Sequence, residues 1–104
     1  MRAFEKAIKH QQEVSYILRL YIAGVTPRST QAVAILKEIC EQYLTNRYEL
    51  EVIDIYQQPH LAQEDQIVAA PTLIKKQPLP QHRLVGDMTN TKRVLAGLGL
   101  RLKD

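Results

Sequence analysis

The segment SYILRLYIAG, Ser15 to Gly24, decides the fold of this chain. The even-numbered residues from Tyr16 to Ile22 form one apolar face, and Ile17, Tyr21 and Ala23 make the opposite face largely apolar. Side chains of a strand alternate between two faces, and a strand with two apolar faces is typical of one covered on both sides. We therefore predict that this segment is the central strand of a sheet.

A helix is predicted directly after this strand. Gly24 can adopt backbone angles that a strand cannot, Thr26 is a favourable N-cap residue, and Pro27 suits the first helical position. Apolar residues then recur every three or four positions, which predicts a helix from about Pro27 to Leu44. The next alternating run, Tyr48 to Ile55, predicts a strand parallel to the first with a right-handed crossover.

The second half of the chain predicts four more elements. Pro59 opens a short helix over residues 60–68, and Ala69 to Lys76 contains a strand. His82 to Asp87 is predicted to be the second arm of a hairpin, and Thr89 can cap a final helix. The resulting order, βαβαββα, is that of the α/β thioredoxin fold.

The last segment, KRVLAGLGLRLKD, fits neither regular period. As a helix it gathers its apolar residues on one face, but Gly97 and Gly99 would each cost about 1 kcal/mol relative to alanine. As a strand, its leucines alternate with Gly99 and Arg101. Two interpretations stay open: an ordinary terminal helix, or a second half, from about His60 onward, with two packings of similar free energy.

Length and composition favour one domain. The chain has 104 residues, 45% of them hydrophobic, which suits a single core, predicted over 14–104, after an N-terminal extension over 1–13. Phe4, Ala7 and Ile8 would allow a short helix in the extension. Neither a signal peptide nor a membrane span is predicted, so we expect a cytoplasmic protein.

The thiols that a thioredoxin-like enzyme would need are absent. Such an enzyme carries two cysteines around a two-residue turn at a helix N-terminus, but aligning on Pro27 puts Val25 and Arg28 at those positions. The single cysteine, Cys40, lies far along the helix on its apolar face, where a small buried hydrophobe is the expected role. A redox or glutathione-linked protein therefore remains only an alternative.

No other catalytic, cofactor or metal site is predicted. One cysteine and three scattered histidines make a zinc site improbable, and no glycine-rich phosphate loop precedes a helix. Glu64 and Asp65 are adjacent on the predicted helix, so they point in different directions and are expected to be surface carboxylates.

Basic residues gather on the predicted hairpin. Lys75, Lys76, His82 and Arg83 could meet an acidic protein surface or phosphate. No aromatic residues are interleaved with them, which argues against nucleic-acid binding. The overall balance, 14 basic against 11 acidic residues, is only mildly basic.

Four segments together resemble the KaiB family. They are YILRLYIAGVTPRS (16–29), VID (52–54), PHLAQEDQIVAAPTL (59–73) and GDMTNTKRVLAGL (86–98). The match runs without gaps from about Tyr16 to Leu102.

The resemblance implies a non-enzymatic clock or stress-related protein that binds the ring ATPase KaiC and modulates its phosphorylation cycle. It also implies two further possible partners: KaiA, which proteins of this family capture, and a KaiB-like sensor-kinase domain, with which they compete for KaiC. In this family the resting form is a homotetramer whose C-terminal half is βααβ, whereas the partner-binding monomer is thioredoxin-like, with αββα. This favours the interpretation with two packings over a static thioredoxin-like adaptor.

The resemblance also assigns roles to residues. We expect Lys75 and Arg83 to lie on the partner face, and Pro71, which matches the cis-proline position of thioredoxin-like proteins, to govern the switch together with Gly97 and Gly99. The chain departs from the family where basic residues are usual, at Gln31, Glu51 and Gln66.

Overall fold

The computed structural model describes residues 15–101. Its elements are β1 (Tyr16–Ile22), α2 (Pro27–Tyr43), β2 (Tyr48–Asp54), α3 (Pro59–Glu64), β3 (Thr72–Gln77), β4 (His82–Val85) and α4 (Thr91–Leu98). The predicted order βαβαββα is confirmed, with α2 ending one residue and α3 four residues earlier than predicted. The helix considered around Phe4, Ala7 and Ile8 lies outside the described residues.

Strand β1 is central, as its two apolar faces predict. The four strands lie in the order β2-β1-β3-β4, with β1 parallel to β2 and antiparallel to β3, and with β3 antiparallel to β4. The β1–β2 register pairs Tyr16 with Tyr48 and Ile22 with Asp54. The predicted parallel pairing of β1 and β2, connected through α2, is therefore confirmed, and the right hand of the crossover stays a prediction.

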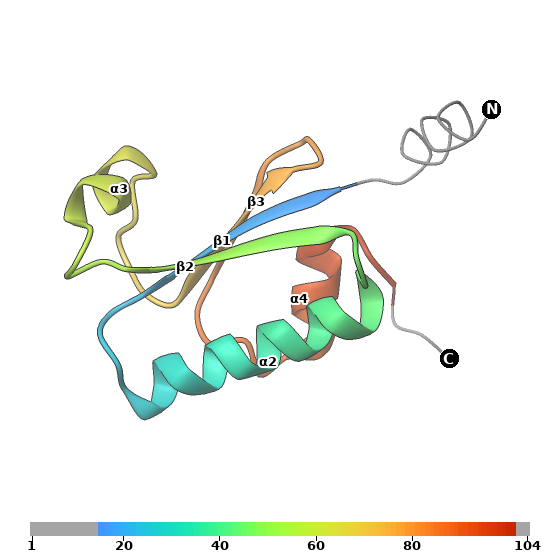
Figure 1. Cartoon of the computed structure of the whole chain (residues 1–104), viewed down its shortest axis with the longest axis horizontal. Helices are drawn as coiled ribbons and strands as arrows, with labels where there is room; N and C mark the ends of the chain where they lie inside the picture. The colour runs from blue at the N-terminus through green and yellow to red at the C-terminus, as the bar shows by residue number, and fades with distance from the viewer. Residues whose placement is uncertain (1–14, 102–104) are drawn as a thin grey trace.

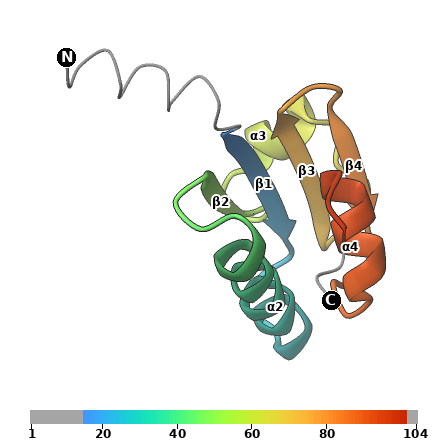
Figure 2. The ribbon, with the colours of Figure 1, turned by 90° about the vertical axis from the view of Figure 1, so that its right-hand side faces the viewer.

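The two faces of the sheet are covered unequally. Figures 1 and 2 show α2 and α4 against one face and α3 against the other, at only one end of the sheet. Among the described residues, the core under α2 and α4 contains fifteen buried apolar residues, whereas the core under α3 contains four: Tyr21, Ile53, Ala62 and Ile74. Helix α3 therefore has much less hydrophobic burial to hold it.

The turn between β1 and α2 is fixed by a capping box. The Thr26 side chain accepts from the Ser29 backbone N–H at 3.1 Å, and the Ser29 hydroxyl oxygen accepts from the Thr26 N–H at 2.8 Å. Pro27 occupies the first helical turn, as predicted, and Gly24 has a φ of +72°, which glycine adopts without strain.

The terminal segment forms helix α4 with a different N-cap from the predicted one. Asn90, not Thr89, accepts from the Arg93 N–H at 3.1 Å, while the Thr89 hydroxyl donates to Asp87. Gly99 is the C-cap residue, with a left-handed φ of +77°, so it ends the helix rather than interrupting it.

The second half has the thioredoxin-like αββα arrangement, the one that the resemblance assigns to the partner-binding form. The peptide bonds before Pro71, Pro78 and Pro80 are cis. The division into an extension over 1–13 and a domain over 14–104 stays a prediction.

The capping box gives a stability prediction. Ser29→Ala removes a buried hydroxyl that bonds both Thr26 and the Gly24 carbonyl, the latter at 2.8 Å, so we expect a loss of about 1 to 2 kcal/mol in the free energy of unfolding. Urea denaturation measures it. Thr30→Ala, at the exposed neighbouring position, should cost less than about 0.5 kcal/mol. Equal losses in the two variants would contradict the capping role.

Candidate functional site

The turn after β1 occupies the position of a thioredoxin active site but carries no thiol. Val25 and Arg28 lie here, beside a small hollow of about 130 Å³ lined by Ala23, Thr26, Arg28, Ser29, Ala70 and Pro71. The Ser29 hydroxyl is held by the carbonyls of Gly24 and Thr26, at 2.8 and 3.0 Å. The hydroxyl is therefore part of the helix cap.

Cys40 lies in the interior of α2, as predicted. Its side chain belongs to the core under α2 and α4 and is fully buried. Burial, with a smaller contribution from the charge of Glu41, raises the pKa of the Cys40 thiol to about 12. Because the thiolate is the reactive form, this cysteine is chemically inert at neutral pH.

Within residues 15–101, no group of three or more histidine, cysteine, aspartate or glutamate side chains is placed to hold a metal ion. None of the helices in that part of the chain is long and apolar enough to cross a membrane.

The surface near the turn is notably apolar. Val25 is 86% exposed, Tyr56 73% and Val68 93%. Tyr56 lies next to the turn, since a methyl group built on Gly24 would be 3.6 Å from its ring. Exposed large apolar side chains at the same end of a sheet are typical of a surface that binds another protein.

Lys75 and Arg83, the two residues predicted to share a partner face, lie on opposite faces of the sheet. Lys75 has Leu73 on its own face, toward α2 and α4, and is only 8% exposed. Arg83 pairs with Ile74, whose side chain is buried under α3. The structure therefore does not bring the two cations together in this arrangement.

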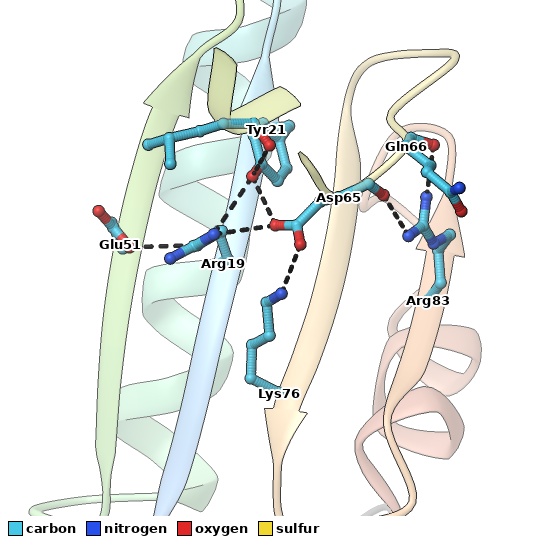
Figure 3. Close-up of polar contacts among 8 residues, drawn as sticks. Arg19, Tyr21, Glu51, Asp65, Gln66, Lys76 and Arg83 are labelled. Atoms are coloured by element: carbon cyan, nitrogen blue, oxygen red, sulfur yellow. Dashed lines mark hydrogen bonds and ion pairs between the residues drawn. The ribbon is translucent and has the colours of Figure 1, made fainter. Parts of the chain in front are cut away.

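The Arg83 guanidinium is used within the chain. It donates to the backbone carbonyls of Asp65 and Gln66, the latter at 2.9 Å, just beyond the end of α3 (Figure 3). Gln66 has a left-handed φ of +54° at this point. An arginine at the end of a helix satisfies carbonyls that have no partner in the helix.

Asp65 is not the surface carboxylate that its helical spacing predicted. It is the C-cap residue of α3, and its side chain is only 11% exposed. It accepts from the Tyr21 hydroxyl at 2.5 Å, from Arg19 Nη1 at 2.9 Å and from Lys76 Nζ at 2.5 Å (Figure 3). Glu64, by contrast, is exposed as predicted.

Strong electrostatics accompany this cluster. Burial alone would raise the pKa of Asp65, but the hydrogen bonds from Lys76, Tyr21 and Arg19 more than offset it and hold the pKa at about 2. Burial, together with the bond to Asp65, raises the pKa of Tyr21 to about 12.

One feature of the sequence could have predicted this cluster. Arg19 is the only charged residue in a strand covered on both sides, so it needs an acidic partner.

The remaining predicted residues are dispersed. Gln31 is exposed on α2, and Glu51 on β2 accepts from Arg19 Nε at 3.2 Å. Pro71 is buried directly before β3, whereas Gly97 is buried within α4 and Gly99 ends that helix.

The fold and this site define the class: a thioredoxin-fold protein without redox thiols. The KaiB domain model matches residues 19–100, and the chain belongs to the KaiB family. It is 49% identical to the circadian clock oscillator protein KaiB of Synechococcus elongatus over 86 residues, 83% of this chain and 84% of that protein. It is 48% identical to the circadian clock protein KaiB3 of Synechocystis sp. over 84 residues, 81% of this chain and 82% of that protein.

Solved structures agree on the fold. The N-terminal domain of Synechococcus elongatus SasA superposes with a TM-score of 0.65 at 27% identity, covering 77% of each chain. Chloroplastic thioredoxin z has a TM-score of 0.68 at 18% identity, covering 94% of this chain and 86% of that one, which supports the fold alone. As a KaiB protein, the chain is a non-catalytic clock-type protein, in agreement with the prediction that it is not an enzyme.

Burial of Cys40 gives a prediction about thiol chemistry. We expect alkylation by iodoacetamide at pH 8 to be at least about 100-fold slower in the native protein than in urea, because the pKa of the thiol is about 12. Mass spectrometry of the alkylated chain measures the rate. The native protein and its Cys40→Ala variant should both leave insulin disulfides unreduced, and reduction that disappears in the variant would revive the redox alternative.

Proposed function

We propose that this protein is a regulatory partner of a KaiC-type ring ATPase and that it modulates the phosphorylation cycle of that ATPase in the cytoplasm. The observation that carries the proposal is the identity of 48 to 50% with KaiB clock proteins over more than four-fifths of the chain. The exposed apolar residues Val25, Tyr56 and Val68 support a function in protein binding.

We further propose that the αββα arrangement is the binding-competent monomer and that the resting form is a homotetramer with a βααβ second half. The resemblance to SasA supports a sensor-kinase domain as competitor for the same ATPase, and KaiA, where it exists, as a further partner. Whether the output is a clock or a stress response depends on the ATPase with which the protein works.

Lys75 and Arg83 remain the proposed partner-binding residues, with one refinement. Because they project from opposite faces of the sheet, a partner can contact both only around the β3–β4 edge of the sheet, where β4 is the outermost strand. The chain lacks the positive charges that are usual in the family at the positions of Gln31, Glu51 and Gln66, so we expect it to be specific for its own ATPase.

Binding is tested by size-exclusion chromatography with light scattering, using the protein with and without its cognate KaiC-type ATPase and ATP. We expect co-elution after long incubation and a tetramer when the protein is alone. Lys75→Met, which keeps the aliphatic stem, and Arg83→Met should each weaken binding about tenfold, or ~1.4 kcal/mol. Lys92→Met, at an exposed lysine of α4, is the matched control. Separate elution of the two wild-type proteins would refute the proposal.

Pro71, Gly97 and Gly99 are the proposed determinants of the switch, and the two glycines predict effects of opposite sign. Gly99→Ala strains the left-handed C-cap by about 1 kcal/mol, so the αββα population and the apparent affinity should fall about fivefold. Gly97→Ala favours the helix, so affinity should rise. Its methyl group would lie in ordinary contact with Leu84 at 3.7 Å and tightly, at 3.3 Å, against the His82 ring, which is exposed and can shift.

Affinity for the ATPase and the fraction of tetramer measure both effects. If the two variants shift the populations in the same direction, the assignment of these glycines to the switch fails.

A further inference from the structure

Few interactions within helix α3 itself stabilise it. It has six residues, Ala62 is the only one of them that is buried, and its N-cap residue Gln58 makes no side-chain capping bond. Isolated helices of this length do not form in water, because nucleation is unfavourable and few hydrogen bonds follow it. Contacts with the sheet must therefore hold α3.

Ala62, with Leu61 and Ile67 partly buried beside it, makes the apolar contacts with the sheet. The Asp65 side chain supplies the polar contacts on β1 and β3. Its Oδ2 accepts from Tyr21 and Arg19 of β1, and its Oδ1 accepts from Lys76 of β3. The Tyr21 hydroxyl also lies 3.0 Å from the Leu61 carbonyl of α3, so one phenol reaches two successive turns of this segment. These are charge-assisted bonds in a site largely shielded from water, where they are strongest.

The Asp65 backbone supplies the contact with β4. Its carbonyl and that of Gln66 accept from the Arg83 guanidinium, which reaches across from the outermost strand of the sheet. Figure 3 shows Asp65 between these donors, with the ammonium and guanidinium groups converging from both sides. One residue therefore ties the end of α3 to three strands.

We propose that Asp65 is a latch that holds α3 on the sheet, and that its release frees residues 59–67 and the Arg83 side chain while β1, α2 and β2 stay folded. The core under α2 and α4 has no part in the latch, because its residues project from the other face of the sheet. The latch is a property of this chain alone and does not depend on binding an ATPase.

The charged surroundings of Asp65 determine how acid acts on the latch. The groups that contact Asp65 are Arg19 and Tyr21 of β1, Lys76 of β3 and Arg83 of β4. Glu51 of β2 contacts Arg19, and Glu64 and His60 are the other titratable residues of α3. The pKa of Asp65 is about 2 in the folded protein, below the ~3.9 of an unfolded aspartate. Its contribution is therefore fully present above about pH 4 and is lost as the pH falls toward 2.

Hydrogen exchange with Asp65→Asn tests the latch. Asparagine keeps the size of the side chain but has no charge. Its amide N–H₂ group is a donor, so it cannot accept hydrogen bonds from Tyr21, Arg19 and Lys76 as the second carboxylate oxygen does. We expect amide exchange at Ala62, Asp65 and Ile67, which donate within this segment, to accelerate at least about tenfold, with α2 amides unchanged. Glu64→Gln, an identical change at the exposed neighbouring residue, should leave every rate as in the wild type.

Two further measurements keep the test decisive. Tyr21→Phe retains the buried ring and removes only the hydroxyl, so it should accelerate the same amides by a smaller factor. Between pH 4 and pH 2, exchange corrected for its intrinsic pH dependence should rise in α3 of the wild type and stay level in α3 of Asp65→Asn. Rates in Asp65→Asn equal to those of Glu64→Gln, or an equal rise in α2 and α3, would overturn the proposal.

Discussion

Burial of both faces of β1 is the constraint on which the rest of the structure depends. A strand with Leu18 and Leu20 on one side and Tyr21 on the other is stable only between two layers. The two layers that cover it differ in how much apolar surface they bury. Helices α2 and α4 fill one side with a large apolar core. On the other side, Arg19 interrupts the apolar face, so its cover must supply a negative charge as well as hydrophobic contact.

This asymmetry divides the molecule into parts with different sources of stability. The β1–α2–β2 unit is local in sequence, and its helix has a capping box and many buried residues. In the second half, β3, β4 and α4 contribute Leu73, Leu84 and Leu95, among others, to the same large core, whereas the short helix α3 has a small apolar core and the polar contacts of Asp65. A segment held by few buried apolar contacts opens locally at a lower free energy than the unfolding of a large core requires. Helix α3 is therefore held by fewer apolar contacts than the helices on the other face of the sheet.

The same division explains what the sequence could predict. Periodicity and caps were sufficient for the order of the elements, because they act within a few residues, but not for the end of α3 or for the N-cap of α4. They were insufficient for Asp65, since helical spacing alone does not show that the residue ends α3 and turns under the sheet. They were also insufficient to predict on which face of the sheet Lys75 and Arg83 lie. Their placement on opposite faces follows from the pairing of Lys75 with His82 and of Ile74 with Arg83, and a proline-rich loop does not reveal that register.

A binding partner shifts a conformational equilibrium only by binding one state better than another. Arg83 provides such a difference. While α3 is in place, its guanidinium is occupied by two carbonyls, so an acidic partner that takes Arg83 must replace those bonds. Any recognition through Arg83 would therefore be thermodynamically linked to release of α3: a change that loosens the contacts of Asp65 would increase the availability of Arg83, and a ligand of Arg83 would weaken the attachment of α3.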